Sequence, residues 1–75
     1  MSTKSPKISG TKLIKILEKL GFEVIRIKGS HHFLKHSDER CTTIPVHRNE
    51  IIGPGLLSKI LDDCEISKEQ LKKLV

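Results

Sequence analysis

The sequence predicts a single α+β domain in the order α-β-β-β-α, with a three-stranded antiparallel sheet, both helices on one face of it, and a short C-terminal helical tail. Two segments repeat their apolar residues at helical spacing, and three short segments between them are strand-like and separated by turn residues. Each helical segment has one apolar stripe, so both helices should cover the same face and leave the other open. A chain of 75 residues has room for one such core.

The first helix is predicted over residues 9–20. Its apolar residues recur at helical spacing, lysines occupy the other side, and Gly21 stands where a helix commonly ends. Residues 1–8 are polar, basic and interrupted by Pro6, so we expect a flexible basic arm there. The single domain should therefore span residues 9–75.

Three strands should follow as an antiparallel meander. The segment FEVIRIK (22–28) is rich in β-branched residues with a period near two, and Gly29 and Ser30 after it are turn residues. HHFLKH (31–36) is the second strand, SDER forms the next turn, and CTTIPV (41–46) is the third strand, which Pro45 brings to an end.

The second helix should begin near Pro54 and Gly55 and continue through LLSKILDDC. Ser67 and Gln70 have the spacing of a capping box, which predicts a last short helix in the tail. The residues expected in the core are Leu13, Leu17, Ile25, Ile27, Ile44, Leu57 and Leu61.

The composition favours a polyanion or an acidic protein as the partner. Fourteen Lys and Arg residues against nine Asp and Glu give a net charge of +5. The hydrophobic content of 36% suits a small two-layer core and a shallow site. The two cysteines have no CxxC spacing, and there is neither a signal peptide nor an apolar run approaching about 18 residues. We therefore expect a cytoplasmic protein with free thiols and no membrane partner.

Three of the four histidines fall within residues 28–36. His31 and His32 follow the turn directly and lie near Lys28 and Arg26, at the edge of a sheet whose outer face has no helical cover. An imidazole with a pKa near 6.5 can accept and donate a proton at neutral pH, as attack of a ribose 2′-hydroxyl on its phosphate requires. On a strand only one of the two neighbours can face the open surface, and because positions 33 and 34 are both apolar, alternation leaves open which one.

Basic residues around this segment could grip RNA phosphates without reading bases. The candidates near the sheet are Arg26, Lys28, Lys35 and Arg48. A metal site is the competing interpretation, but His32 and His36 would lie about 13 Å apart on a strand, too far to share one zinc ion. The cysteines and His47 add no recognised ligand spacing, so we expect neither a metal site nor any other cofactor.

Two stretches, LIKILEKLGFEVIRIKGSHHFLKH and TTIPVHRNEIIGPGLLSKILDDCEIS, resemble the HicA (YcfA-like) toxin family over residues 10–67. The resemblance implies a fold similar to a double-stranded-RNA-binding domain. It also implies an mRNA interferase activity, as the toxin of a type II toxin–antitoxin system, and neutralisation by a HicB-like antitoxin protein. The expected partners are thus mRNA and that antitoxin.

The same resemblance places the family's active-site histidine on His31, with His32 as the close contender. Gly29 and Ser30 match the turn that presents it, and Pro45 and His47 match the family's P-x-H block, to which we assign a supporting role in RNA binding. Two functions from different classes remain: a metal-independent endoribonuclease, and a non-catalytic module that binds RNA or an acidic protein through the same open sheet face.

Overall fold

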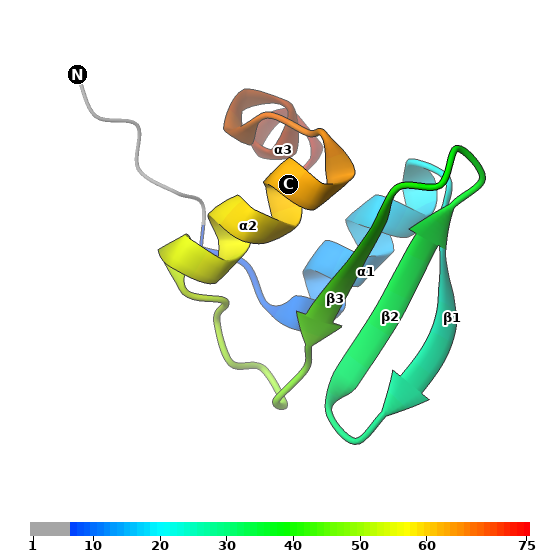
Figure 1. The fold of residues 1–75 in the computed structure, drawn as a ribbon. Helices are drawn as coiled ribbons and strands as arrows, with labels where there is room; N and C mark the ends of the chain where they lie inside the picture. Colours follow the sequence, from blue (N-terminus) through cyan, green and yellow to red (C-terminus); the bar gives the residue numbers. More distant parts are fainter. Residues whose placement is uncertain (1–6) are drawn as a thin grey trace.

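The computed structural model describes residues 7–75 (Figure 1), so most of the expected arm lies outside the described residues. The strands form one antiparallel sheet in the order β1-β2-β3. The predicted α+β class, element order and tail are confirmed. The elements are α1 (Gly10–Lys19), β1 (Phe22–Lys28), β2 (His31–His36), β3 (Cys41–Pro45), α2 (Pro54–Cys64) and α3 (Lys68–Leu74).

Helix α1 begins at a side-chain cap, because the Ser9 hydroxyl accepts a hydrogen bond from the backbone N–H of Lys12 at 3.2 Å. Ile8, at the end of the expected arm, is buried, and its carbonyl accepts from the N–H of Ile52 at 2.9 Å. The packed part of the chain therefore begins by Ile8. Across residues 7–75, no helix has the length and apolarity needed to cross a membrane.

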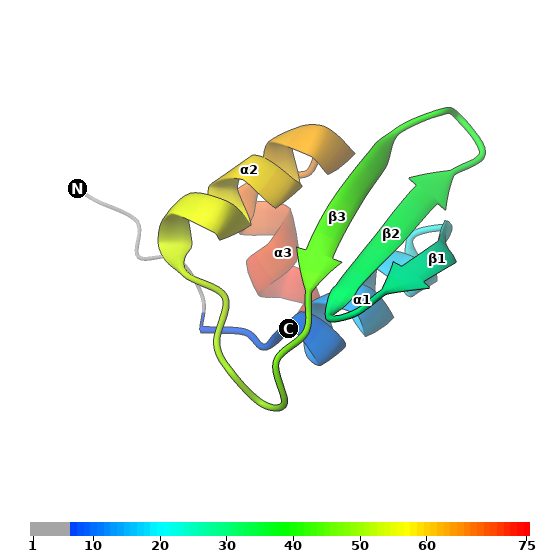
Figure 2. The same cartoon turned by 60° about the horizontal axis from the view of Figure 1, so that its bottom comes forward.

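Helices α2 and α3 complete the same core. Figures 1 and 2 show α2 alongside β3 and α1 behind the sheet. The hydroxyl of Thr42 on β3 donates to a carboxylate oxygen of Asp63 on α2 at 3.1 Å. The predicted capping box is confirmed, because the Ser67 hydroxyl and the Gln70 side chain satisfy each other's backbone N–H groups at the start of α3.

The core lies between the sheet and the helices, and the other sheet face carries no helix in the described part of the chain. On the sheet, Phe22, Leu34 and Ile44 point into the core. The predicted core residues that prove buried are Leu13, Leu17, Ile44, Leu57 and Leu61. The prediction is wrong for Ile25 and Ile27, which are 59% and 60% exposed.

A β-bulge accounts for Ile25. Val24 pairs with Leu34 and Arg26 pairs with Phe33, so β1 has one extra residue, Ile25, where β2 has none. Without the bulge, strict alternation would put Arg26 on the same face as the buried Phe22. The bulge turns Arg26 to the open face instead, and Ile25 borders a hollow on that side.

Ile27 pairs with His32 on the helix side of the sheet, but no helix reaches it there. Helix α1 starts beside β3, at the opposite edge, and a Cβ atom on Gly10 would lie 2.5 Å from the carbonyl oxygen of Pro45. Since β1 is the other edge strand, Ile27 is left uncovered near the hairpin turn.

Candidate functional site

The turn between β1 and β2 presents the candidate catalytic histidines. Gly29 has φ +60°, and no atom lies within 4 Å of where a Cβ would stand. A positive φ at the first residue of a two-residue hairpin turn is the type II′ arrangement, which glycine adopts without steric cost. Backbone conformation, and not lack of space, therefore favours glycine here. Lys28 and His31 form the strand pair that flanks the turn.

The two candidate histidines lie on opposite faces of the sheet. Leu34 is fully buried, so the even positions of β2 face the helices and the odd positions face the open side. His31 is accordingly exposed on the open face, where it pairs with Lys28 and Pro45. His32 lies on the helix side, at the strand end, and is half-buried. The structure thus shows that His31, and not His32, faces the open side, which the sequence leaves open.

Ser30 contacts two imidazoles. Its carbonyl oxygen accepts from the N–H of Val46 at 2.7 Å and lies 3.3 Å from Nδ1 of His32. A carbonyl oxygen only accepts, so Nδ1 of His32 carries the proton and Nε2 is unprotonated in the neutral ring. The Ser30 hydroxyl lies 3.5 Å from Nε2 of His47. Ser30 therefore joins the Gly-Ser-His turn to the P-x-H block.

Two of the candidate phosphate-binding residues accompany His31. Arg26 and Lys28 both follow the bulge and lie on the open face, where Lys28 is directly opposite His31. Both side chains are exposed. The bulge thereby gathers positive charge on the face that carries His31.

The other two basic candidates are placed differently. Lys35 lies four residues along β2 from His31, about 13 Å away. Its ammonium group pairs with the carboxylate of Glu39 at 3.2 Å. Arg48 is exposed in the loop after β3 with φ +54°, directly following His47 in the chain. The structure therefore separates Lys35 from the turn and leaves Arg48 beside the P-x-H block.

A shallow hollow of about 670 Å³ runs over the open face from His31 toward α2. Its walls are mainly apolar, with polar groups contributed by β3 and α2. The lining includes Ile25, Phe33, Cys41, Thr43, Leu56 and Lys59. The composition predicts a shallow site, and this hollow lies on the open face beside His31.

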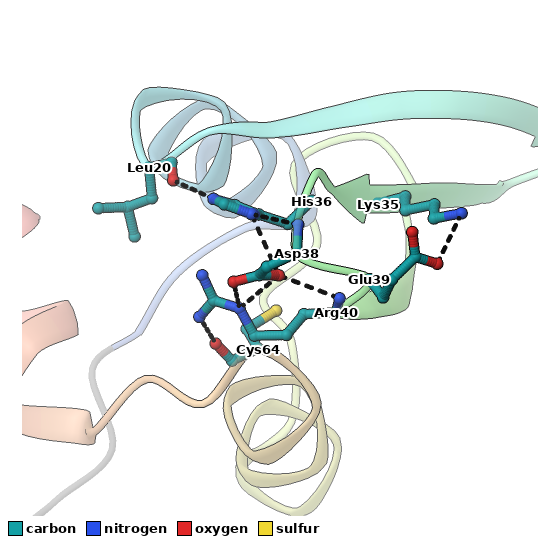
Figure 3. A network of polar contacts seen from close by, with 7 residues as sticks. All are labelled: Leu20, Lys35, His36, Asp38, Glu39, Arg40 and Cys64. Atoms are coloured by element: carbon teal, nitrogen blue, oxygen red, sulfur yellow. Dashed lines mark hydrogen bonds and ion pairs between the residues drawn. The ribbon is translucent and has the colours of Figure 1, made fainter.

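A polar network at the far end of the sheet was missed by the sequence reasoning (Figure 3). Nε2 of His36 donates to the carbonyl oxygen of Leu20, and Nδ1 accepts from the N–H of Asp38, both at 3.2 Å. The Asp38 carboxylate binds Nε of Arg40 at 2.8 Å, and Arg40 also donates to the carbonyl oxygen of Cys64. The only signal in the sequence is the i, i+2, i+4 spacing of His36, Asp38 and Arg40 around a turn.

The electrostatics of this network point to a structural role. The hydrogen bond from Arg40 lowers the pKa of Asp38, and the same contact raises the pKa of Arg40. Burial raises the pKa of the Cys64 thiol to about 11. The network ties the end of β2 to the ends of α1 and α2, and His36 belongs to it.

The histidines with HxxxH spacing do not converge. His32 bonds to Ser30 at one end of β2, and His36 bonds to Leu20 at the other end. Within residues 7–75, no group of three His, Cys, Asp or Glu side chains could hold a metal ion.

Fold and site together define a small basic α+β domain with a histidine-bearing hairpin at one end of an open sheet. Residues 10–66 match the family model described as the HicA toxin of bacterial toxin–antitoxin systems. The match covers well over half of the chain, and the protein belongs to the HicA toxin family. The predicted family is thereby confirmed, and with it a toxin that pairs with an antitoxin. No curated protein matches the chain.

Proposed function

We propose that this protein is the toxin of a type II toxin–antitoxin system and acts in the cytoplasm as a metal-independent endoribonuclease, an mRNA interferase. The observation that carries the proposal is the hairpin end of the sheet. There His31 and His32 follow the turn, His47 reaches Ser30, and basic side chains lie on the same face as His31.

The chemistry needs only imidazoles and the substrate's own hydroxyl. An imidazole takes the proton from the 2′-hydroxyl, the 2′-oxygen attacks the adjacent phosphorus, and the bond to the 5′-oxygen breaks. The products are a 2′,3′-cyclic phosphate and a 5′-hydroxyl. His31 and His32 are the candidate catalytic residues. Basic side chains would hold the RNA backbone, and Gly29 and Ser30 shape the turn.

Purified toxin and a labelled RNA strand test the proposal. Cleavage should persist in EDTA and should leave a 2′,3′-cyclic phosphate at the new end. RNA carrying a 2′-deoxy substitution at the cut site should bind and resist cleavage. If EDTA stops the reaction, or if the 2′-deoxy strand is cut, the mechanism is wrong.

The partner that silences this site should be a HicB-like antitoxin with an acidic surface. The toxin is basic, with a net charge of +5, and Arg26 and Lys28 are exposed on the candidate face. Charge complementarity would speed the encounter more than it would set the affinity.

A second candidate function is a non-catalytic module that binds RNA or an acidic protein through the open face. The observation that favours it is the apolar hollow there, with Ile25 exposed and Phe33 half-buried beside His31. Under this function, matched strands with and without the 2′-hydroxyl would bind equally and neither would be cleaved.

A further inference from the structure

We propose that His32 and His47 form the acid–base pair of this site, and that Ser30 orients both rings. The assignment rests on the proposed endoribonuclease function and adds the second proton-transfer group to it. Cleavage through a 2′-hydroxyl needs one group that removes a proton and one that delivers a proton to the leaving oxygen. The residues in contact with Ser30 are the candidates for these two groups.

Each ring has one nitrogen held by Ser30. His32 uses Nδ1, which donates to the Ser30 carbonyl oxygen at 3.3 Å, and His47 uses Nε2, which lies 3.5 Å from the Ser30 hydroxyl. The other nitrogen of each ring has no hydrogen-bond partner among residues 7–75. Catalytic hydrogen bonds are often long before substrate binds, so the 3.5 Å contact suits such a site. Two nitrogens are thus left for substrate.

The bonding pattern also assigns the roles. Because Nδ1 of His32 donates to a carbonyl, its Nε2 is unprotonated in the neutral ring and can serve as the base. His47 is exposed, so water can solvate its imidazolium form, and in that form both nitrogens donate. The Ser30 hydroxyl can accept the bond from Nε2, which leaves the Nδ1–H of His47 as the acid.

The surface beside His47 is partly apolar. His47 borders a hollow of about 170 Å³ whose other lining residues include Pro45, Ile51 and Leu56. Ile51 is 49% exposed and Leu56 is 38% exposed, so apolar surface is available next to the ring.

The step balances without any further reactant. His32 removes the proton of the 2′-hydroxyl, the 2′-oxygen forms a bond to phosphorus, and the bond from phosphorus to the 5′-oxygen breaks. The imidazolium of His47 gives its proton to that 5′-oxygen. His31 lies on the other face, where its strand partner Lys28 contributes positive charge for the phosphate backbone.

The pH dependence of cleavage by the full chain is the first test. The wild type should give a bell-shaped profile of kcat/KM, with one limb from each imidazole. His47→Gln should lower the rate by about a hundredfold or more and remove the alkaline limb, while His32→Gln should remove the acid limb. Each variant should bind the uncleavable 2′-deoxy strand within a few-fold of the wild type, which separates proton transfer from RNA binding. His47→Asn provides a second variant if His47→Gln does not fold.

A substrate with sulfur in place of the 5′-oxygen gives the sharper test, because a thiolate leaves without protonation. This RNA should restore His47→Gln to within about tenfold of the wild type and should not restore His32→Gln. Ser30→Ala, which keeps the carbonyl and loses the hydroxyl, should lower kcat more than it changes KM. The acid–base pair is wrong if the wild type cleaves RNA and the His47 variants are fully active, or if the sulfur substrate does not rescue them. Either result is still compatible with the proposed endoribonuclease function. A wild type that cleaves no RNA overturns both.

Discussion

Gly21 lies against the imidazole of His36: a Cβ atom built on Gly21 would be 2.7 Å from Nε2. Gly21 also has φ +100°, a conformation that side chains other than glycine rarely adopt. The contact places the end of α1 under the ring that donates to the carbonyl oxygen of Leu20. One residue thus meets both a steric and a conformational requirement.

Gly21→Ala should therefore lower the free energy of unfolding by about 1–3 kcal/mol, through backbone strain and displacement of His36. Urea unfolding followed by circular dichroism measures it. Gly55→Ala is the matched control, because no atom lies within 4 Å of its Cβ position and it sits in the first turn of α2. That change should be neutral or stabilising by up to about 1 kcal/mol. Equal effects from both variants would contradict the role given to Gly21.

The ion pair of Asp38 with Arg40 should make stability depend on pH. The hydrogen bond from Arg40 holds the pKa of Asp38 below its ordinary value of 3.8. At pH values between the folded-state and unfolded-state pKa of Asp38, the unfolded chain binds more protons than the folded chain. The ion pair therefore makes its full contribution to the free energy of unfolding above the unfolded-state pKa, and that contribution is lost as pH falls through the folded-state pKa. Asp38→Asn should have a lower free energy of unfolding than the wild type near neutral pH, and this difference should shrink as the pH falls. Asp62→Asn, an exposed control, should show no such change. A difference that stays constant down to about pH 2 would disprove the linkage.

The two cysteines should differ in reactivity toward a thiol reagent. Burial raises the pKa of Cys64 to about 11, whereas Cys41 is exposed on the open face. Because the thiolate is the nucleophile, the native protein at about pH 8 should lose one thiol quickly and the second only on unfolding. Cys41→Ser should leave native protein unreactive until urea is added. Fast labelling of native Cys41→Ser would show that Cys64 is reached by solvent.

Separate alanine variants should distinguish the two neighbouring histidines. The family resemblance favours His31, whereas hydrogen bonding to Ser30 favours His32 as the base. We expect His32→Ala to lower cleavage by about a hundredfold to ten-thousandfold, with a smaller defect for His31→Ala. The folded far-ultraviolet spectrum should be unchanged in both. A larger defect in His31→Ala would move the base to the open face, and full activity of both variants would rule out the histidine mechanism.

Hydrogen exchange of the toxin–antitoxin complex should locate the silenced surface. Covering a shallow site is the simplest way to block it, so amides across residues 26–36 should gain protection when the antitoxin binds. The free toxin measured under the same conditions is the reference. Protection confined to the outer side of α1 would instead indicate inhibition at a distance from the hairpin.

Features set by local signals were predictable from the sequence. The limits of β1 and β2 follow from the turn residues around them, and the cap of α3 follows from Ser67 and Gln70. The bulge is not predictable, because alternation in FEVIRIK does not reveal that one residue is inserted, and the sequence therefore predicts Ile25 in the core.

The candidate site divides in the same way. The Gly29–Ser30 turn is visible in the sequence, but the contact of Ser30 with His47 depends on how β3 pairs with β2, across 17 residues of chain. Pairing register is set by the packing of the whole sheet, which no short motif encodes. The hydrogen bond from His36 to Leu20 is not predictable from the sequence for the same reason.

The bulge at Ile25 also affects how this chain behaves among copies of itself. Within residues 7–75, strand β1 is an edge of the sheet, and a regular seven-residue edge would offer its unpaired N–H and C=O groups to a strand from another molecule. The bulge breaks that row of groups near its middle, and Arg26 and Lys28 add charge repulsion between two such edges. The irregularity that directs basic side chains to the open face therefore also discourages edge-to-edge aggregation.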